Sequence, residues 1–410
     1  MSANLRESRL GAGRYVEPVQ PPADTTTTVH QLQTHDGASV PGVLRTVPGA
    51  TAVAFLMHPR SDFTHHVLVS EFLSRGRAVW TQGTRTAGND LTLIHERALL
   101  DMAAGHEFLR GLGFDEIISV GHSGGGALAA FYMRQAGLPP VERLADTPGG
   151  RPVPLGDAMM PMPDKAVFMA PHPGQGALLL SMIDPSVTDE DDPASVDAEL
   201  NPYDKVNGFA EPPMSSTYSD SFIDRYRRAQ RARVQRIDDE AKRRVAASAA
   251  ARKRFKESGD AADRRSSLSS GVITVHRTDA DLRGVDLSID ANDRPYGSVF
   301  GSRPDITDYG VVGFGRLTTP EAWLSTWSGI SSRAGFLDNA PGVTVPTLFI
   351  ELTGDQCLYP PQAEEMVEAI TGPVSHVRVP GRHFGAALSA GEPTGATLAG
   401  IEIGRWLESV

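Results

Sequence analysis

Short apolar runs alternate with amphipathic stretches along most of the 410-residue chain. The amphipathic stretches carry apolar residues at i, i+3 and i+4 and end near glycine, as helices do; they cover residues 65–76, 93–113 and 125–137. The apolar runs are shorter, and six of them predict strands: residues 51–57, 77–83, 116–121, 165–171, 345–352 and 375–380. Because near-continuous apolar strands separated by helices are buried on both sides, we expect an α/β fold with a mostly parallel central sheet and helices on both faces.

The beginning of the chain departs from this pattern. Residues 1–25 are polar, contain proline and show no periodicity, which predicts an N-terminal arm or a disordered tail. Two β-rich segments follow, residues 26–34 and 39–47, and Asp36-Gly37 between them is a strong hairpin signal. The sheet should therefore open with an antiparallel hairpin.

The alternation of strands and helices stops after Pro171 and resumes at Val345. We interpret residues 26–171 and 345–410 as one α/β core. Residues 172–344 then form a large, mainly helical cap inserted between the sixth and seventh strands of that core.

The cap contains one long helix candidate, residues 219–258, with 13 basic and 6 acidic side chains. We expect it to lie on the body through its apolar stripe and to expose its charges. The alternatives are pairing with the same helix of a second subunit, which would give a homo-oligomer, and, as the weakest, binding of nucleic acid. The stripe consists of Ile223, Tyr226, Val234, Ile237, Ala241 and Val245.

A second cap helix is expected from Thr319 onward, because Thr318-Thr319-Pro320-Glu321 has the pattern of a capping box. It carries Trp323 and Trp327 one turn apart. Their indole rings can line a ligand cavity or simply pack in the core of the cap.

Composition and charge limit the partners and the compartment that we expect for this protein. The chain carries a formal charge of −11, which disfavours a nucleic-acid partner that relies on overall basicity. Its single cysteine, Cys357, cannot form an internal disulfide and fits a reducing compartment. No signal-peptide core and no apolar run approaching 18 residues is present, so we expect a soluble cytoplasmic protein without a membrane partner.

The most informative local motif is Gly121-His122-Ser123-Gly124-Gly125. It matches the pattern Gly-x-Ser-x-Gly and lies directly after an apolar strand and directly before a helix of small residues. A nucleophile on so sharp a turn requires glycine on both sides, and the helix that follows directs its N-terminus toward developing negative charge. The alternative is a glycine-rich turn without chemistry.

Serine needs a base, and the base needs an acid that orients it. Asp355 follows the predicted strand of residues 345–352, and His383 follows the last predicted strand, residues 375–380. The alternatives are a helix N-cap role for Asp355 and His376 as the base, although His376 lies inside its strand rather than past its end.

With these motifs the chain resembles the α/β-hydrolase superfamily, over residues 26–171 and 345–410. The resemblance rests on the elbow GHSGG, on TGD with Pro360 five residues downstream, and on the late GRHFG. It implies the α/β-hydrolase fold, with Ser123 as nucleophile, Asp355 as orienting acid and His383 as general base.

The resemblance also implies an oxyanion hole made of two backbone amides. Gly124 supplies the first, and the second should come from the loop after the third strand, which here reads His58-Pro59-Arg60-Ser61. Proline has no N–H, which leaves Arg60 as the second donor, with Ser61 behind it. The Arg60 guanidinium can also hold a carboxylate or carbonyl of the substrate, or it can form a surface ion pair with Asp62.

Several histidines remain. We expect His172 to face the site after the sixth strand and to contact substrate, whereas His58 and His122 are expected to be structural. His65-His66 have no partner at metal-ligand spacing, so no metal is expected.

These features predict a serine hydrolase without a cofactor that cleaves an ester or lactone of a moderately sized, hydrophobic small molecule through an acyl-enzyme. Hydrolysis of a carbon–carbon bond, an amide or a thioester, and acyl transfer, use the same triad and remain open. A non-catalytic receptor that binds a small molecule under the cap is a further alternative.

Overall fold

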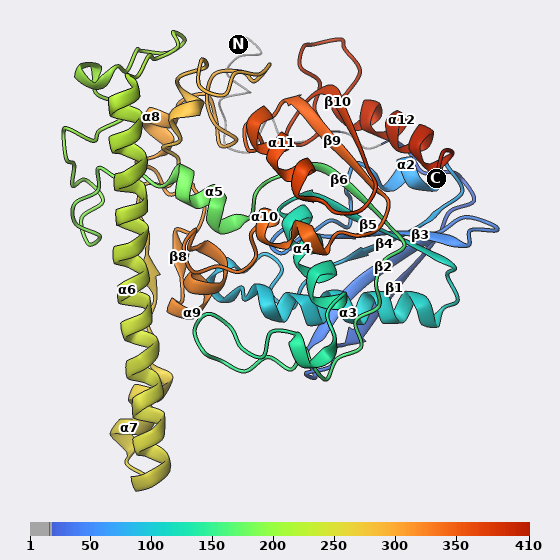
Figure 1. Cartoon of the computed structure of the whole chain (residues 1–410), viewed down its shortest axis with the longest axis horizontal. Helices are drawn as coiled ribbons and strands as arrows, with labels where there is room; N and C mark the ends of the chain where they lie inside the picture. Colours follow the sequence, from blue (N-terminus) through green and yellow to red (C-terminus); the bar gives the residue numbers. More distant parts are fainter. Residues whose placement is uncertain (1–15, 17–18) are drawn as a thin grey trace.

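The computed structural model describes residue 16 and residues 19–410, so most of the predicted N-terminal arm lies outside the described residues. An eight-stranded sheet forms the centre of the molecule, in the order β1-β2-β4-β3-β5-β6-β9-β10 (Figure 1). From β4 onward all neighbouring strands are parallel, which confirms the predicted sheet. The strands are β1 (Thr26–Gln33), β2 (Ser39–Thr46), β3 (Ala52–Met57), β4 (Ala78–Gln82), β5 (Glu116–Ser123), β6 (Lys165–Pro171), β9 (Thr347–Gly354) and β10 (Val374–Arg382).

The two faces of the sheet each bury their own apolar cluster. Phe55 and Phe168 point to one face, while their chain neighbours Leu56 and Val167 point to the other, as alternation along a strand requires. The first face is covered by α3 (His95–Gly111), α4 (Gly124–Ala136) and α11 (Pro360–Ala369), and the second by α2 (Val69–Leu73) and α12 (Gly395–Leu407). Together with the sharp turn from β5 into α4, this strand order is the α/β-hydrolase fold.

The predicted hairpin is confirmed. β1 pairs antiparallel with β2, and β2 pairs antiparallel with β4, so the hairpin forms one edge of the sheet. Gly37 in the turn has a φ of 80°, which glycine adopts without the penalty that a side chain would bring.

The segment between β6 and β9 contains the elements that lie outside the layered core (Figure 1). The longest helix, α6 (Asp220–Ser258), runs along one side of the molecule, and its distal end packs against α7 (Ala261–Leu268). The other elements are α5 (Gln175–Met182), the paired strands β7 (Ile273–Thr274) and β8 (Leu317–Thr318), α8 (Pro304–Thr307), α9 (Pro320–Ala322) and α10 (Phe336–Asn339).

The apolar stripe of α6 is buried as predicted, but the side chains it packs against in these clusters belong to the cap itself and not to the α/β core. Val234, Ile237 and Ala241 are buried in one cluster with Trp323 and Trp327. The charged side chains of α6 lie largely on its exposed faces. Within the described residues, no helix is at once long enough and apolar enough to cross a membrane.

The expected helix after Thr319 forms in two parts. The Thr319 side chain caps α9 by accepting a hydrogen bond from the Ala322 N–H, and the chain then continues as a π-helical turn over Trp323–Trp327. Trp323 is fully buried and its Nε1–H donates to Asp238 Oδ1 on α6 at 2.7 Å. Its ring therefore joins the long helix to the body of the cap.

Candidate active site

Ser123 lies at the junction of β5 and α4 in a conformation that few side chains adopt, with a φ of 55° and a ψ of −129°. The neighbouring glycines make this turn sterically possible. A Cβ on Gly121 would lie 2.6 Å from the Gly126 Cα, and one on Gly125 would lie 2.6 Å from the Met57 carbonyl oxygen. The Gly-x-Ser-x-Gly pattern thus has the close-packed geometry of a nucleophile elbow.

The structure brings the three predicted residues together, although more than 200 residues separate the serine from the other two. His383 Nε2 lies 2.8 Å from Ser123 Oγ, and His383 Nδ1 lies 2.9 Å from each carboxylate oxygen of Asp355. All three lie at the carboxyl ends of parallel strands of the sheet: β9 and β10 are neighbours, and β6 separates β9 from β5. This continuous chain of hydrogen bonds can move a proton from the serine to the imidazole and stabilise the imidazolium that forms.

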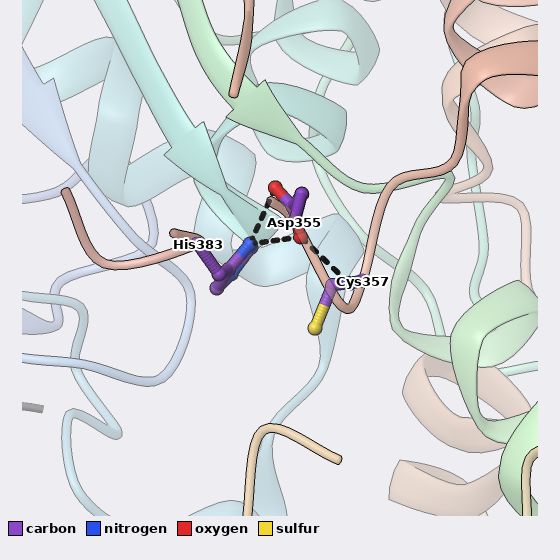
Figure 2. A group of neighbouring side chains, drawn as sticks. All are labelled: Asp355, Cys357 and His383. Carbon is purple, nitrogen blue, oxygen red and sulfur yellow. Dashed lines mark hydrogen bonds and ion pairs between the residues drawn. The ribbon is translucent and has the colours of Figure 1, made fainter. Parts of the chain in front are cut away.

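The Asp355 carboxylate is fully buried and held from a second side (Figure 2). Its Oδ1 accepts the backbone N–H groups of Cys357 at 2.6 Å and Leu358 at 3.1 Å. Asp355, Cys357 and His383 also place ligand atoms within 4.8 Å of one another, as a metal site would. The carboxylate and Nδ1 already bind each other, however, so the hydrogen-bonded pair accounts for this grouping.

His122 supports the loop that carries His383. Leu68 N–H donates to His66 Nδ1 at 3.2 Å, His66 Nε2 lies 2.8 Å from His122 Nδ1, and His122 Nε2 lies 2.8 Å from the His383 carbonyl oxygen. Burial lowers the pKa of His122 to about 4 and that of His66 well below its ordinary value, so both rings are neutral at pH 7. One set of tautomers satisfies every bond, with His66 donating to His122 and His122 donating to the carbonyl.

His106, remote from the elbow, is another buried neutral histidine. It stacks on Tyr132 with ring centroids 4.7 Å apart, and burial lowers its pKa to about 4. Between pH 6.5 and about 4 the unfolded chain therefore binds a proton that the folded protein does not bind. As the pH falls through this window, the free energy of unfolding falls by up to about 1.4 kcal/mol per pH unit for this group.

We expect His106→Phe to reduce the pH dependence of stability by that amount. Urea unfolding at pH 7, 6 and 5 measures it, with the exposed His35→Phe as the matched control that leaves the slope unchanged. An unchanged slope in His106→Phe would contradict a neutral buried ring.

The loop after β3 differs from what the sequence suggests for the oxyanion hole. The N–H groups of Arg60 and Ser61 donate to His58 Nδ1, at 3.0 and 2.8 Å. The Arg60 amide therefore already has a partner within its own loop. His58 reaches Gly124 instead. Its Nε2 lies 3.0 Å from the position that a Cβ on Gly124 would occupy.

The Arg60 side chain is held by Asp90 of the core and by two aromatic rings of the cap. Its guanidinium forms a two-pronged ion pair with Asp90, not with Asp62, and it lies 5.0 Å from the Phe314 ring centroid and 4.8 Å from that of Trp327. Arg60 and Trp327 thus join core and cap to each other, and Trp323 packs further away against α6. Neither tryptophan is placed on the elbow by any contact of the described residues.

His172 does lie at the elbow. Its backbone N–H donates to the Ser123 carbonyl oxygen at 3.3 Å, and its Nε2 lies 3.0 Å from the Cβ position of Gly124. Gln175, in the first turn of α5, reaches the same point with its Nε2 at 2.3 Å. Sequence analysis missed Gln175, because a single glutamine at the start of a helix carries no signal of its own.

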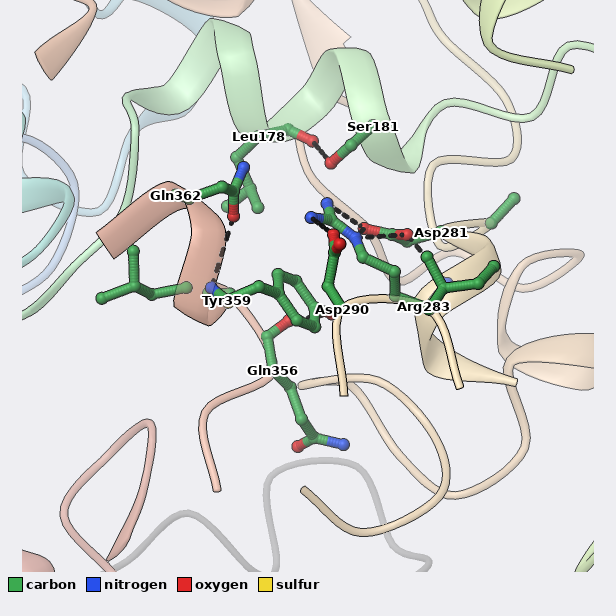
Figure 3. Close-up of polar contacts among 12 residues, drawn as sticks. Leu178, Ser181, Asp281, Arg283, Asp290, Gln356, Tyr359 and Gln362 are labelled. Atoms are coloured by element: carbon green, nitrogen blue, oxygen red, sulfur yellow. Dashed lines mark hydrogen bonds and ion pairs between the residues drawn. The ribbon is translucent and has the colours of Figure 1, made fainter. Parts of the chain in front are cut away.

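A cap loop contacts the loop that carries Asp355, and Arg283 of the cap lies against Tyr359 (Figure 3). The Asn292 side-chain amide donates to the Asp355 carbonyl oxygen at 2.9 Å, and the Gln356 amide donates to the Gly297 carbonyl oxygen at 2.8 Å. The Arg283 guanidinium, paired with Asp281, stacks 3.9 Å from the Tyr359 ring centroid. These contacts tie the cap to the loop that carries Asp355.

Apolar side chains of core and cap meet beside the triad. Leu178 and Met182 of α5 pack with Phe300 and with Cys357, and Phe384, the residue after His383, packs against the same cluster. An apolar cluster shared by core and cap therefore lies next to the residues that carry the acid and the base.

Comparison with known proteins gives matches in structure alone: no family model and no curated protein matches the sequence. DcsB in complex with its substrate analogue is 11% identical, with a TM-score of 0.49 and coverage of 94% of this chain and 99% of DcsB. The esterase domain of a Rhodothermus marinus protein is 12% identical (TM-score 0.43, coverage 94% and 98%). A thermophilic esterase from Thermogutta terrifontis is 13% identical (TM-score 0.42, coverage 93% and 98%). With TM-scores below 0.5, these similarities say nothing of what this chain binds or cleaves.

Proposed function

We propose that this protein is a serine hydrolase that cleaves a carboxylic ester or lactone of a hydrophobic small molecule through an acyl-enzyme. The observation that carries the proposal is the hydrogen-bonded chain from Ser123 Oγ through His383 to Asp355 at a strained strand-to-helix turn. A serine hydroxyl is a poor nucleophile at neutral pH, and a chain of this kind is what activates it.

In the proposed reaction His383 Nε2 takes the proton of Ser123 as Oγ attacks the substrate carbonyl carbon, and Asp355 holds the imidazole through Nδ1–H. His383 then gives the proton to the leaving alkoxide, which departs as the alcohol. Water, activated by the same imidazole, attacks the acyl-enzyme and releases the acid. No cofactor enters any of these steps.

The negative charge that forms on the carbonyl oxygen needs two donors. We assign the first to the Gly124 N–H, which follows the nucleophile. We assign the second to His58 Nε2–H, because burial and the nearby Arg60 cation lower the pKa of His58 well below its ordinary value, and its Nδ1 accepts two backbone N–H groups. A neutral ring whose Nδ1 accepts carries its proton on Nε2.

The apolar cluster around Leu178, Met182 and Phe384 supports a hydrophobic substrate. Buried apolar walls gain free energy by removing apolar groups of the ligand from water, so longer acyl or alcohol chains should be preferred over acetate esters.

A substrate panel tests the proposal. We expect the purified protein to hydrolyse 4-nitrophenyl esters, with kcat/KM rising from acetate to octanoate, and a fluorophosphonate probe to label Ser123. A lactone, an anilide, a thioester and a β-diketone in the same panel, and an added alcohol as acyl acceptor, distinguish the related reactions. Labelling of Ser123 without turnover of any ester or lactone would contradict ester hydrolysis, and absence of labelling would contradict a nucleophilic serine.

A further inference from the structure

Three buried side chains converge beside Gly124, the residue that follows the nucleophile. The nitrogen atoms Gln175 Nε2, His172 Nε2 and His58 Nε2 lie 2.3, 3.0 and 3.0 Å from the position of a Cβ on Gly124. The three side chains come from α5 and from the loops after β6 and β3, and they are 3%, 1% and 5% exposed. This is more hydrogen-bonding capacity than an oxyanion hole needs, because the Gly124 N–H and His58 Nε2–H suffice for one oxygen.

The protonation of His172 can be assigned from its surroundings. Its Nδ1 accepts the Gly174 N–H at 3.0 Å, and burial, with His383 nearby, lowers the pKa of the ring well below its ordinary value. The ring is therefore neutral and carries its proton on Nε2. His172 presents an N–H donor toward Gly124, in addition to the one from His58.

Gln175 stands out because its amide is unpaired. Neither Nε2 nor Oε1 has a hydrogen-bond partner among the described residues, although both atoms are buried. Leaving both ends of a buried amide unpaired is unfavourable, and native structures keep such groups where a ligand or an ordered water satisfies them. The reaction steps proposed above do not use this amide.

We propose that Gln175 and His172 bind a second oxygen of the substrate, a hydroxyl on the second or third carbon of the acyl group. A hydroxyl oxygen accepts from His172 Nε2–H and from the Gln175 amide N–H, and its proton is donated to Gln175 Oε1. A keto oxygen would leave that acceptor unpaired. The hydroxyl is placed on the acyl side because this pair lies against Gly124, whose N–H holds the reacting carbonyl oxygen.

This proposal rests on the proposed ester hydrolysis and narrows it to hydroxyacyl esters. The residues act on specificity: Gln175 and His172 touch the substrate, but they neither attack it nor transfer its proton. A site built to hydrogen-bond a hydroxyl discriminates against the analogue that lacks it, because its own polar groups then remain unpaired.

Four methyl esters test the proposal: butyrate, 2-hydroxybutyrate, 3-hydroxybutyrate and 3-oxobutyrate, each followed by proton release. For the wild-type protein we expect one of the hydroxy esters to exceed butyrate in kcat/KM by at least about tenfold, and to exceed the oxo ester. Equal values for hydroxy esters and butyrate overturn the proposal and leave ester hydrolysis intact. An oxo ester as good as the better hydroxy ester overturns the assignment of a hydroxyl.

Variants locate the effect. Gln175→Met keeps the length of the side chain and removes both polar atoms, so the ratio of hydroxy ester to butyrate should fall about tenfold, toward one. Gln235→Met makes the same change on the exposed face of α6, where the amide binds Asp239, and should leave the ratio unchanged. A ratio that survives Gln175→Met in a folded variant overturns the role of this amide, and the wild-type ratio tests the proposal even where that variant does not fold.

Failure of the proposed function shows separately, as lack of turnover of all four esters together with an unlabelled Ser123. In that case calorimetry on Ser123→Ala decides the inference. If Ser123→Ala binds a hydroxy ester more tightly than methyl butyrate, the result supports a hydroxyl site at Gln175 and His172. Equal binding of the two esters overturns that site.

Discussion

Replacing Ser123 with alanine should leave a folded protein whose kcat for its best ester is lower by about 10³- to 10⁶-fold. The loss is this large because the variant has no hydroxyl to form the acyl-enzyme, and only binding and the oxyanion donors remain. The fold should survive, since alanine makes no greater demand than serine on the unusual backbone at this position, where φ is 55°.

The matched control for this variant is Ser119→Ala, the same chemical change four residues earlier on the same strand. Ser119 is buried and its Oγ has no hydrogen-bond partner among the described residues, so its removal should leave both activity and stability nearly unchanged. Steady-state kinetics, thermal unfolding and fluorophosphonate labelling on the three proteins make the comparison. If Ser123→Ala retained its activity, Ser123 could not be the nucleophile.

Replacing Asp355 with asparagine should lower kcat by about 10²- to 10⁴-fold without unfolding the protein. The asparagine oxygen can still accept the N–H groups of Cys357 and Leu358, which turns its NH₂ group toward His383 Nδ1. Nδ1 then has to accept, the imidazole proton moves to Nε2, and Nε2 can no longer take the proton of Ser123. The variant would keep the geometry of the triad, but His383 would carry its proton on Nε2, the nitrogen that has to accept the serine proton.

Asp293→Asn is the control for this prediction. Asp293 is exposed, and its backbone N–H donates to the Thr353 carbonyl oxygen near the end of β9, so the same substitution is made close to the acid but outside the triad. We expect wild-type kcat/KM for this control. A mild loss in Asp355→Asn, comparable to that of the control, would mean that another group orients His383.

The sheet, the elbow and the order of Ser123, Asp355 and His383 could be read from the chain because each depends on neighbours in sequence. Apolar runs of strand length, bounded by glycine or proline, predict parallel strands, and the residue just past each run lies at the same edge of the sheet. The apolar stripe of α6 is local in the same sense, since it repeats every three or four residues and its packing follows from that period.

The surroundings of the nucleophile were beyond such reasoning. The Arg60 amide is turned toward His58, the Arg60 guanidinium is held by Asp90 and two cap rings, and Gln175 reaches Gly124 from a helix that the alternation of strands and helices does not include. Each of these depends on how loops and the cap fold back over the carboxyl edge of the sheet. Contacts between segments far apart in the chain depend on packing in three dimensions. Local patterns in the sequence therefore do not predict them.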